Sequence, residues 1–134
     1  MKNINKAYVS ELFTYLQDGK REQFFAKVSD NAVWEVLGTH PIAGKYLNTK
    51  DFITATFARL DKCLKSISLH LKNVLVDQNY AAVEITSTGI ANNNESYNNI
   101  YCWIIELNPD GFIISVRIYT DSVLVQRLID ENEI

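Results

Sequence analysis

Residues 97–121, which read YNNIYCWIIELNPDGFIISVRIYTD, constrain the fold of this chain more than any other stretch. Two apolar runs rich in aromatic and β-branched residues, Ile100–Leu107 and Phe112–Tyr119, flank the sequence Asn108-Pro109-Asp110-Gly111. Proline suits the first central position of a turn and glycine a positive φ, so the pattern predicts a β-hairpin. Because both runs are apolar at nearly every position, we expect this hairpin at the centre of a sheet, with both faces covered.

Helical patterns dominate residues 6–64. From Lys6, apolar residues recur at spacings of three and four, which is typical of an amphipathic helix, and Gly19 provides a stop. The elements predicted next are a short helix over about residues 21–27, a strand over Ala32–Leu37, a loop over Gly38–Gly44, and a third helix that Asn48 or Thr49 caps and that runs to about Leu64.

Strands dominate the rest of the chain. Residues 66–76 alternate and then lose phase around Lys72-Asn73, which suggests a bulge. The remaining predicted elements are a strand over Tyr80–Ala91, the hairpin, and a short last helix over Val123–Ile129 capped by Asp121 or Ser122. We therefore expect residues 1–134 to form one α+β domain, with helices packed on one face of a curved antiparallel sheet.

Composition restricts the classes of partner. The formal charge of −3 gives no general basic field, so nucleic acid is not an expected partner. No apolar run approaches the ~20 residues that span a bilayer, and no membrane is expected either. Cys63 and Cys102 lack the spacing of a metal site or redox motif, which favours buried, reduced thiols in a cytoplasmic protein. We expect no metal and no cofactor.

Three stretches carry a resemblance to a known family. They are AVWEVLGTHPIAGKY at 32–46, YNNIYCWIIELNPDGFI at 97–113, and SVRIYTDS at 115–122. In order and spacing they resemble the SnoaL-like, ketosteroid-isomerase-related branch of the nuclear transport factor 2-like superfamily, over roughly the whole chain. The resemblance implies a cone of curved sheet, largely antiparallel or mixed, packed against three helices from the N-terminal half and a short C-terminal helix. It also implies an apolar pocket for a small hydrophobic molecule, and a homodimer through the outer sheet face.

Glu35 is the first candidate catalytic residue, since it interrupts an otherwise apolar strand. In resembling isomerases the matching position holds the Asp general base, and an enclosed carboxylate has a pKa raised towards neutrality. The alternative is a Glu35 side chain that points to solvent, because alternation alone does not decide which face lies inside. His40, in the loop expected at the pocket mouth, is a candidate acid or base, or else a structural loop residue. Asp121 is a candidate pocket acid or a helix N-cap.

Other positions depart from isomerase chemistry. That family stabilises its intermediate with a Tyr and a protonated Asp, and the matching positions here are Leu12 and Trp103. Tyr15 lies one helical turn from Leu12, and the Trp103 indole can still donate. Ile118 stands where many SnoaL-like proteins and epoxide hydrolases carry an acid. The residues expected to line the pocket are Leu12, Tyr15, Trp34, Phe57, Tyr101, Trp103, Val116 and Ile118.

Three functions remain open at this point. One is a cofactor-free isomerase, cyclase or dehydratase that transfers protons on a small hydrophobic or polyketide-like substrate. The second is a non-catalytic binding or interaction module, which the apolar residues at Leu12, Trp103 and Ile118 favour. The third is a dimerising scaffold whose interior is filled by its own aromatic side chains. A fold alone does not choose between them.

Overall fold

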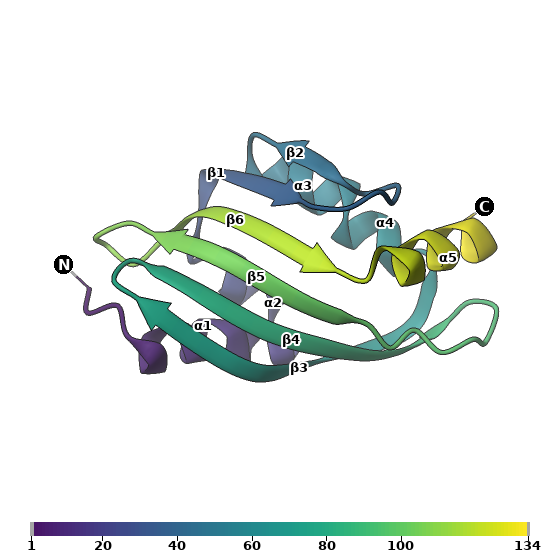
Figure 1. Cartoon of the computed structure of the whole chain (residues 1–134), viewed down its shortest axis with the longest axis horizontal. Helices are drawn as coiled ribbons and strands as arrows, with labels where there is room; N and C mark the ends of the chain where they lie inside the picture. The colour runs from purple at the N-terminus through teal and green to yellow at the C-terminus, as the bar shows by residue number, and fades with distance from the viewer. Residues whose placement is uncertain (1, 134) are drawn as a thin grey trace.

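A six-stranded mixed sheet organises the protein, as seen in a computed structural model that describes residues 2–133 (Figure 1). The strand order is β2-β1-β6-β5-β4-β3. The strands are β1 Val28–Val36, β2 Gly44–Tyr46, β3 Leu64–Asp77, β4 Tyr80–Ala91, β5 Ile100–Leu107 and β6 Ile113–Thr120. Only β1 and β6 pair in parallel among these strands, and the other four pairings are antiparallel.

Four helices cover one face of this sheet, and a fifth follows the last strand (Figure 1). They are α1 Lys6–Gln17, α2 Arg21–Phe25, α3 Thr49–Ala55, α4 Phe57–Asp61 and α5 Ser122–Asn132. This arrangement confirms the predicted α+β class and the short C-terminal helix. Within residues 2–133, no helix is long and apolar enough to cross a bilayer.

The predicted hairpin is confirmed and lies at the centre of the sheet, where β5 pairs with β6 and β4. Its turn closes as the residue types predict. The Asn108 carboxamide oxygen accepts hydrogen bonds from the amides of Asp110 and Phe112, and Gly111 adopts a φ of +85°. The Tyr8 hydroxyl of α1 donates to the Gly111 carbonyl at 2.6 Å, so the hairpin is tied to the first helix. A Cβ at Gly111 would lie 2.5 Å from that hydroxyl.

Two of the differences from the predicted elements concern the third helix and the loop after the first strand. The third helix is divided into α3 and α4 at Thr56, where φ and ψ are −116° and −79°. The Thr56 hydroxyl donates to the Phe52 carbonyl at 2.7 Å, a back-bond of the kind that bends helices. The predicted loop is wrong at its end, since residues 44–46 form edge strand β2 against β1. The bulge predicted near Lys72-Asn73 is confirmed by a register shift between Leu71 and Asn73.

An aromatic cluster fills one part of the interior between sheet and helices. Trp34 of β1 is fully buried and stacks on Phe52 of α3 with ring centroids 3.8 Å apart. Trp103 of β5 meets Trp34 and Phe13 edge-on, at 5.7 and 5.5 Å. Edge-to-face and offset pairs of this kind add to the free energy of burial. The interior is therefore partly packed solid by the chain's own rings.

A buried hydrogen-bond relay fixes α3 to β1. The Trp34 indole N–H donates to the Thr49 hydroxyl at 3.0 Å, and that hydroxyl donates to the Ser29 carbonyl at 2.8 Å. We expect Thr49→Val, which keeps the shape of the side chain, to lower the free energy of unfolding by about 1–3 kcal/mol, because it leaves the indole N–H without an acceptor.

Urea unfolding followed by tryptophan fluorescence measures this effect. Thr54→Val is the matched control, since Thr54 lies on the same helix and is exposed. Equal unfolding midpoints for the two variants would show that the relay contributes nothing to stability.

Candidate functional site

A cavity in two adjoining sections lies between the helices and the inner face of the sheet. Its two sections hold about 70 and 60 Å³. They share the side chains of Phe57, Leu60, Tyr97, Tyr101 and Trp103. The other lining residues are Arg21, Asp61, Leu64, Ile67, Leu69 and Ile85 in one section, and Val36, Ile42, Phe52, Thr56, Ile118, Thr120 and Val125 in the other.

Strand alternation explains why these side chains converge. Side chains two residues apart point to the same face of a sheet, so Tyr101 and Trp103 of β5 both face inward, as do Ile118 and Thr120 of β6. The short helix α4 provides the opposite wall through Phe57 and Leu60. The lining is almost entirely apolar, which suits a hydrophobic guest.

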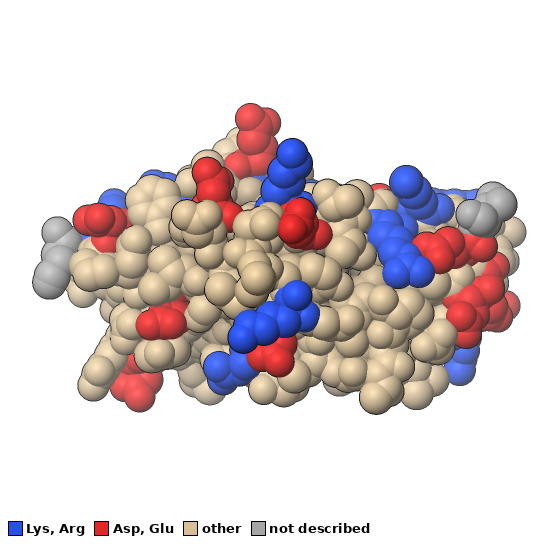
Figure 2. All heavy atoms as spheres, turned by 90° about the horizontal axis from the view of Figure 1, so that it is seen from above, with Lys and Arg blue, Asp and Glu red and all other residues tan. Residues whose placement is uncertain are grey.

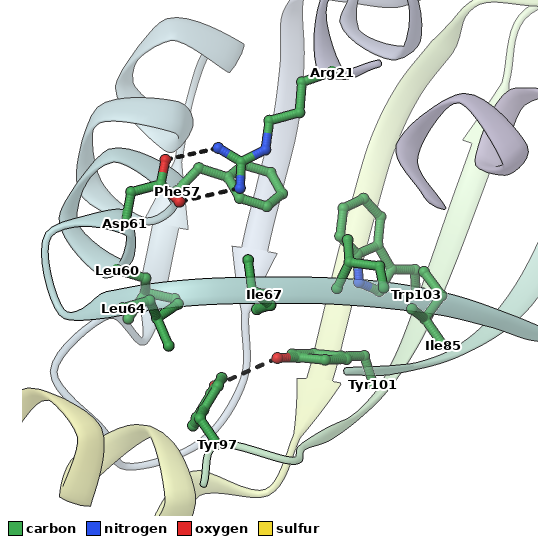
Figure 3. A pocket seen from close by; sticks show the side chains of 11 residues that line it. Arg21, Phe57, Leu60, Asp61, Leu64, Ile67, Ile85, Tyr97, Tyr101 and Trp103 are labelled. Carbon is green, nitrogen blue, oxygen red and sulfur yellow. Dashed lines mark hydrogen bonds and ion pairs between the residues drawn. The ribbon is translucent and has the colours of Figure 1, made fainter. Parts of the chain in front are cut away.

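Two tyrosine hydroxyls form the polar part of the cavity wall (Figure 3). The Tyr101 hydroxyl donates to the Tyr97 hydroxyl at 3.4 Å and lies 3.2 Å from the Ser87 hydroxyl. The Asn99 carboxamide donates to the Tyr97 hydroxyl at 3.0 Å. Burial raises the pKa of Tyr97 and raises that of Tyr101 well above its ordinary value. Both phenols therefore stay protonated. The Tyr101 proton is directed at the Tyr97 oxygen, so Tyr97 is the phenol whose proton can be offered to an oxygen atom in the cavity.

The mouth of the cavity carries its charged groups. The Arg21 guanidinium binds the Asp61 carboxylate with two hydrogen bonds, of 2.7 and 3.1 Å. Its central carbon lies 4.7 Å from the centroid of the Phe57 ring, within the range of a cation–π contact. Figure 3 shows this ion pair at one side of the lining and the two tyrosines at the other. The Arg21 and Asp61 side chains are 37% and 45% exposed, so the pair is open to solvent.

Comparisons with known proteins agree with this architecture. Residues 9–116 match the model of the SnoaL-like domain. The chain belongs to this family. It is 28% identical over 137 residues to "Dimerizing cyclase tstC" of Talaromyces stipitatus, a match that covers 99% of this chain and 60% of the relative.

Two solved structures of low sequence identity show the same fold. An NTF2-like protein from Burkholderia thailandensis has a TM-score of 0.79 and 15% identity, over 92% of this chain and 95% of that one. TerC has a TM-score of 0.72 and 14% identity, over 93% and 97% of the two chains. This SnoaL-like chain spans about 60% of the length of the curated relatives that it matches.

The structure places Glu35 outside the cavity of the SnoaL-like domain. Its neighbours Trp34 and Val36 are buried, at 0% and 4% exposure, so the side chain between them points to the opposite face of the sheet. There its cross-strand neighbours are Lys45 of β2 and Arg117 of β6. The expected pocket position of Glu35 is wrong, because the large Trp34 side chain takes the inward place on this strand.

His40 and Asp121 also lie away from the cavity lining. His40 is buried in the β1–β2 loop with 6% exposure, and its Nε2 lies 3.1 Å from the Leu37 carbonyl. Asp121 caps α5, since its carboxylate accepts a hydrogen bond from the Val123 amide at 3.0 Å. The N-cap reading of Asp121 is confirmed, and the three predicted catalytic residues are not brought together.

Four of the residues expected to line the pocket do so: Phe57, Tyr101, Trp103 and Ile118. Leu12, Trp34 and Val116 are instead closed inside the core, and Tyr15 packs against that core without reaching the cavity. Among residues 2–133, no group of three or more His, Cys, Asp or Glu side chains is arranged to hold a metal ion.

Sequence reasoning missed Tyr97, Arg21 and Asp61. Tyr97 lies in the polar segment that precedes β5. An aromatic residue in such a segment was the one sign in the sequence that this position is buried. Arg21 and Asp61 are separated by 40 residues, and no local pattern links them.

The buried His40 ring gives stability a pH dependence. Its Nδ1 is buried without a hydrogen-bond partner, and burial lowers the pKa of His40 from its ordinary 6.5, with the Leu37 hydrogen bond acting in the opposite direction. The unfolded chain therefore binds a proton more readily than the folded one. This contribution to stability is present above pH 6.5 and is lost as the pH falls towards the lowered pKa.

We expect His40→Gln to flatten the loss of stability between pH 7 and pH 5, measured as the free energy of unfolding in urea at each pH. Glutamine retains a side-chain N–H that can reach the Leu37 carbonyl and does not titrate. His70→Gln on β3 is the control and should leave the slope in place. An unchanged slope in His40→Gln would contradict the burial effect.

Proposed function

We propose that this chain is a cofactor-free enzyme of the isomerase, cyclase or dehydratase type, acting by proton transfer on a small hydrophobic substrate that carries an oxygen. The observation that supports the proposal best is the apolar cavity with two protonated tyrosine hydroxyls in its wall. A phenol that keeps its proton can donate to a carbonyl oxygen and stabilise the negative charge that develops there when an adjacent C–H loses its proton.

The volume of the cavity limits the size of the guest. An engineered apolar cavity of about 150 Å³ binds benzene, and the two adjoining sections here, of about 70 and 60 Å³, together come close to that volume. The cavity therefore suits one ring, and a larger polyketide-like substrate would need the helices to move apart.

The proton acceptor in this proposal is Asp61. Among residues 2–133 it is the one carboxylate in the lining of the two sections. In the structure Arg21 holds it, so it must leave that ion pair before it can accept a proton from a substrate. This assignment replaces Glu35, whose side chain is on the other face of the sheet.

The relatives support a small-molecule enzyme. The curated relatives that match most of this chain are named dimerizing cyclases, and TerC was crystallised with polyporic acid. A non-catalytic binding module is the second candidate function. It is favoured by the fact that, among the described residues, the charged groups in the lining bind each other.

Cyclohexanone is a suitable probe, because it combines one apolar ring with one carbonyl. We expect it to bind in the cavity, with chemical-shift changes at Tyr101 and Trp103. Tyr97→Phe should weaken its binding about 2- to 12-fold, the effect of losing one neutral hydrogen bond of about 0.5–1.5 kcal/mol. Tyr119→Phe, on the outer face, is the matched control and should bind as the wild type does.

Exchange of the α-protons of cyclohexanone in D2O then separates the two functions. An enzyme should accelerate exchange, and Asp61→Asn should remove the acceleration while the ketone still binds. Binding without any acceleration would favour the binding module. If cyclohexanone does not bind at all, the cavity is not the site of either function, and both the enzyme and the binding module are contradicted.

We also propose that the protein forms a homodimer through the outer face of the sheet. That face exposes large apolar side chains on the two central strands, with Ile100 64% and Tyr119 44% exposed. Exposed apolar side chains that lie together mark interaction sites, because association with a second copy removes them from water. The dimer is the arrangement that the family resemblance implies.

Light scattering tests this arrangement. We expect the wild-type chain to have the mass of two copies and Ile100→Lys to have the mass of one, because a lysine buried in an apolar interface lacks a partner. Leu47→Lys is the control at an exposed leucine in the connection between β2 and α3. A monomeric wild type, or a dimer that Ile100→Lys leaves intact, would contradict the interface.

A further inference from the structure

We propose that Arg21 is the group that selects the substrate, and that it does so by binding a carboxylate at the mouth of the cavity in place of Asp61. The inference rests on the proposed function, since it concerns the same cavity. It narrows the substrate class to apolar acids that carry a second oxygen, with the acid at the mouth and the other oxygen at the tyrosines.

The position of Arg21 carries the first step. Its side chain comes from the first residue of α2 and contributes to the lining together with Phe57 and Asp61. The central carbon of the guanidinium lies 4.7 Å from the centroid of the Phe57 ring, so the ring supports the group while both of its terminal nitrogens are directed at Asp61. A guanidinium held in this way presents a fixed fork to a carboxylate.

The bond to Asp61 shows what that fork recognises. Two guanidinium nitrogens bind the two carboxylate oxygens, at 2.7 and 3.1 Å, which is the bidentate geometry of strong arginine–carboxylate pairs. Asp61 therefore occupies the place that a substrate carboxylate would take. Because both side chains are more than one third exposed, the resident pair contributes little to stability and can be exchanged for another carboxylate at small cost.

The rest of the lining explains why the acid must lie at this end. Between the ion pair and the tyrosines the wall is built from aliphatic and aromatic side chains, including Ile67 and Leu64 (Figure 3). A buried charge without partners is strongly unfavourable there. The two polar ends of the lining thus set the orientation of an elongated guest, with its charge outward.

Phenylacetate and 2-phenylethanol are the probes, since they have the same ring and chain length and differ in the charged group. We expect wild-type protein to bind phenylacetate more tightly than 2-phenylethanol in titrations followed by NMR. Arg21→Gln should weaken phenylacetate binding about tenfold and change 2-phenylethanol binding by less than about twofold. Arg21→Lys should restore part of the preference, because lysine supplies the charge without the fork.

Asp61→Asn gives the opposite test. Removing the resident carboxylate frees Arg21, so phenylacetate should bind several-fold more tightly, with 2-phenylethanol unchanged. If Arg21→Gln weakens acid and alcohol equally, Arg21 only closes the cavity and the inference is wrong, although the proposed function stands. If Asp61→Asn does not strengthen acid binding, the exchange of carboxylates is likewise wrong. If neither probe binds the wild type, both the inference and the proposed cavity function fail.

Discussion

The stacking of Trp34 on Phe52 is the contact on which the geometry of the interior depends. A β-strand presents alternate residues to its two faces, and the largest apolar side chain on β1 takes the inward position. The indole is then fixed between α3 and the sheet, by the Phe52 ring at 3.8 Å and by the Thr49 hydroxyl. This choice of face sends Glu35 outward, so β1 contributes the apolar side chain of Val36 to the cavity wall and no carboxylate.

The same aromatic cluster divides the interior into a solid part and a hollow part. Phe13, Phe24, Trp34 and Trp103 meet edge-on near the N-terminal helices. Beyond them the smaller residues of β3, β4 and β6 leave the space that becomes the cavity. The polar groups of the proposed site are the tyrosine hydroxyls and the Arg21–Asp61 ion pair. Charges elsewhere lie on the surface, where Figure 2 shows acidic and basic side chains intermingled on the face seen from above.

Local patterns in the sequence predicted the elements well, and the site only in part. The hairpin, the strand Tyr80–Ala91 and the bulge near Asn73 follow from turn chemistry and alternation, which act over a few residues. The face of β1 that lies inside could not be predicted. Trp34 and Glu35 are neighbours on opposite faces, and only tertiary packing decides which of them points inward. The Arg21–Asp61 pair joins two helices 40 residues apart, and no local pattern reports such a meeting.

The break in the helix at Thr56 has a consequence for the size of the guest. Phe57, Leu60 and Asp61 all stand on the short segment after the break, whereas Phe52, which holds Trp34, stands before it. A change of torsion at Thr56 would therefore move these three lining side chains together. It would also change the edge-on contacts of the Phe57 ring with Phe52 and Phe25. The room for a larger guest in the proposed site is thus coupled through Phe57 to the packing of the aromatic cluster.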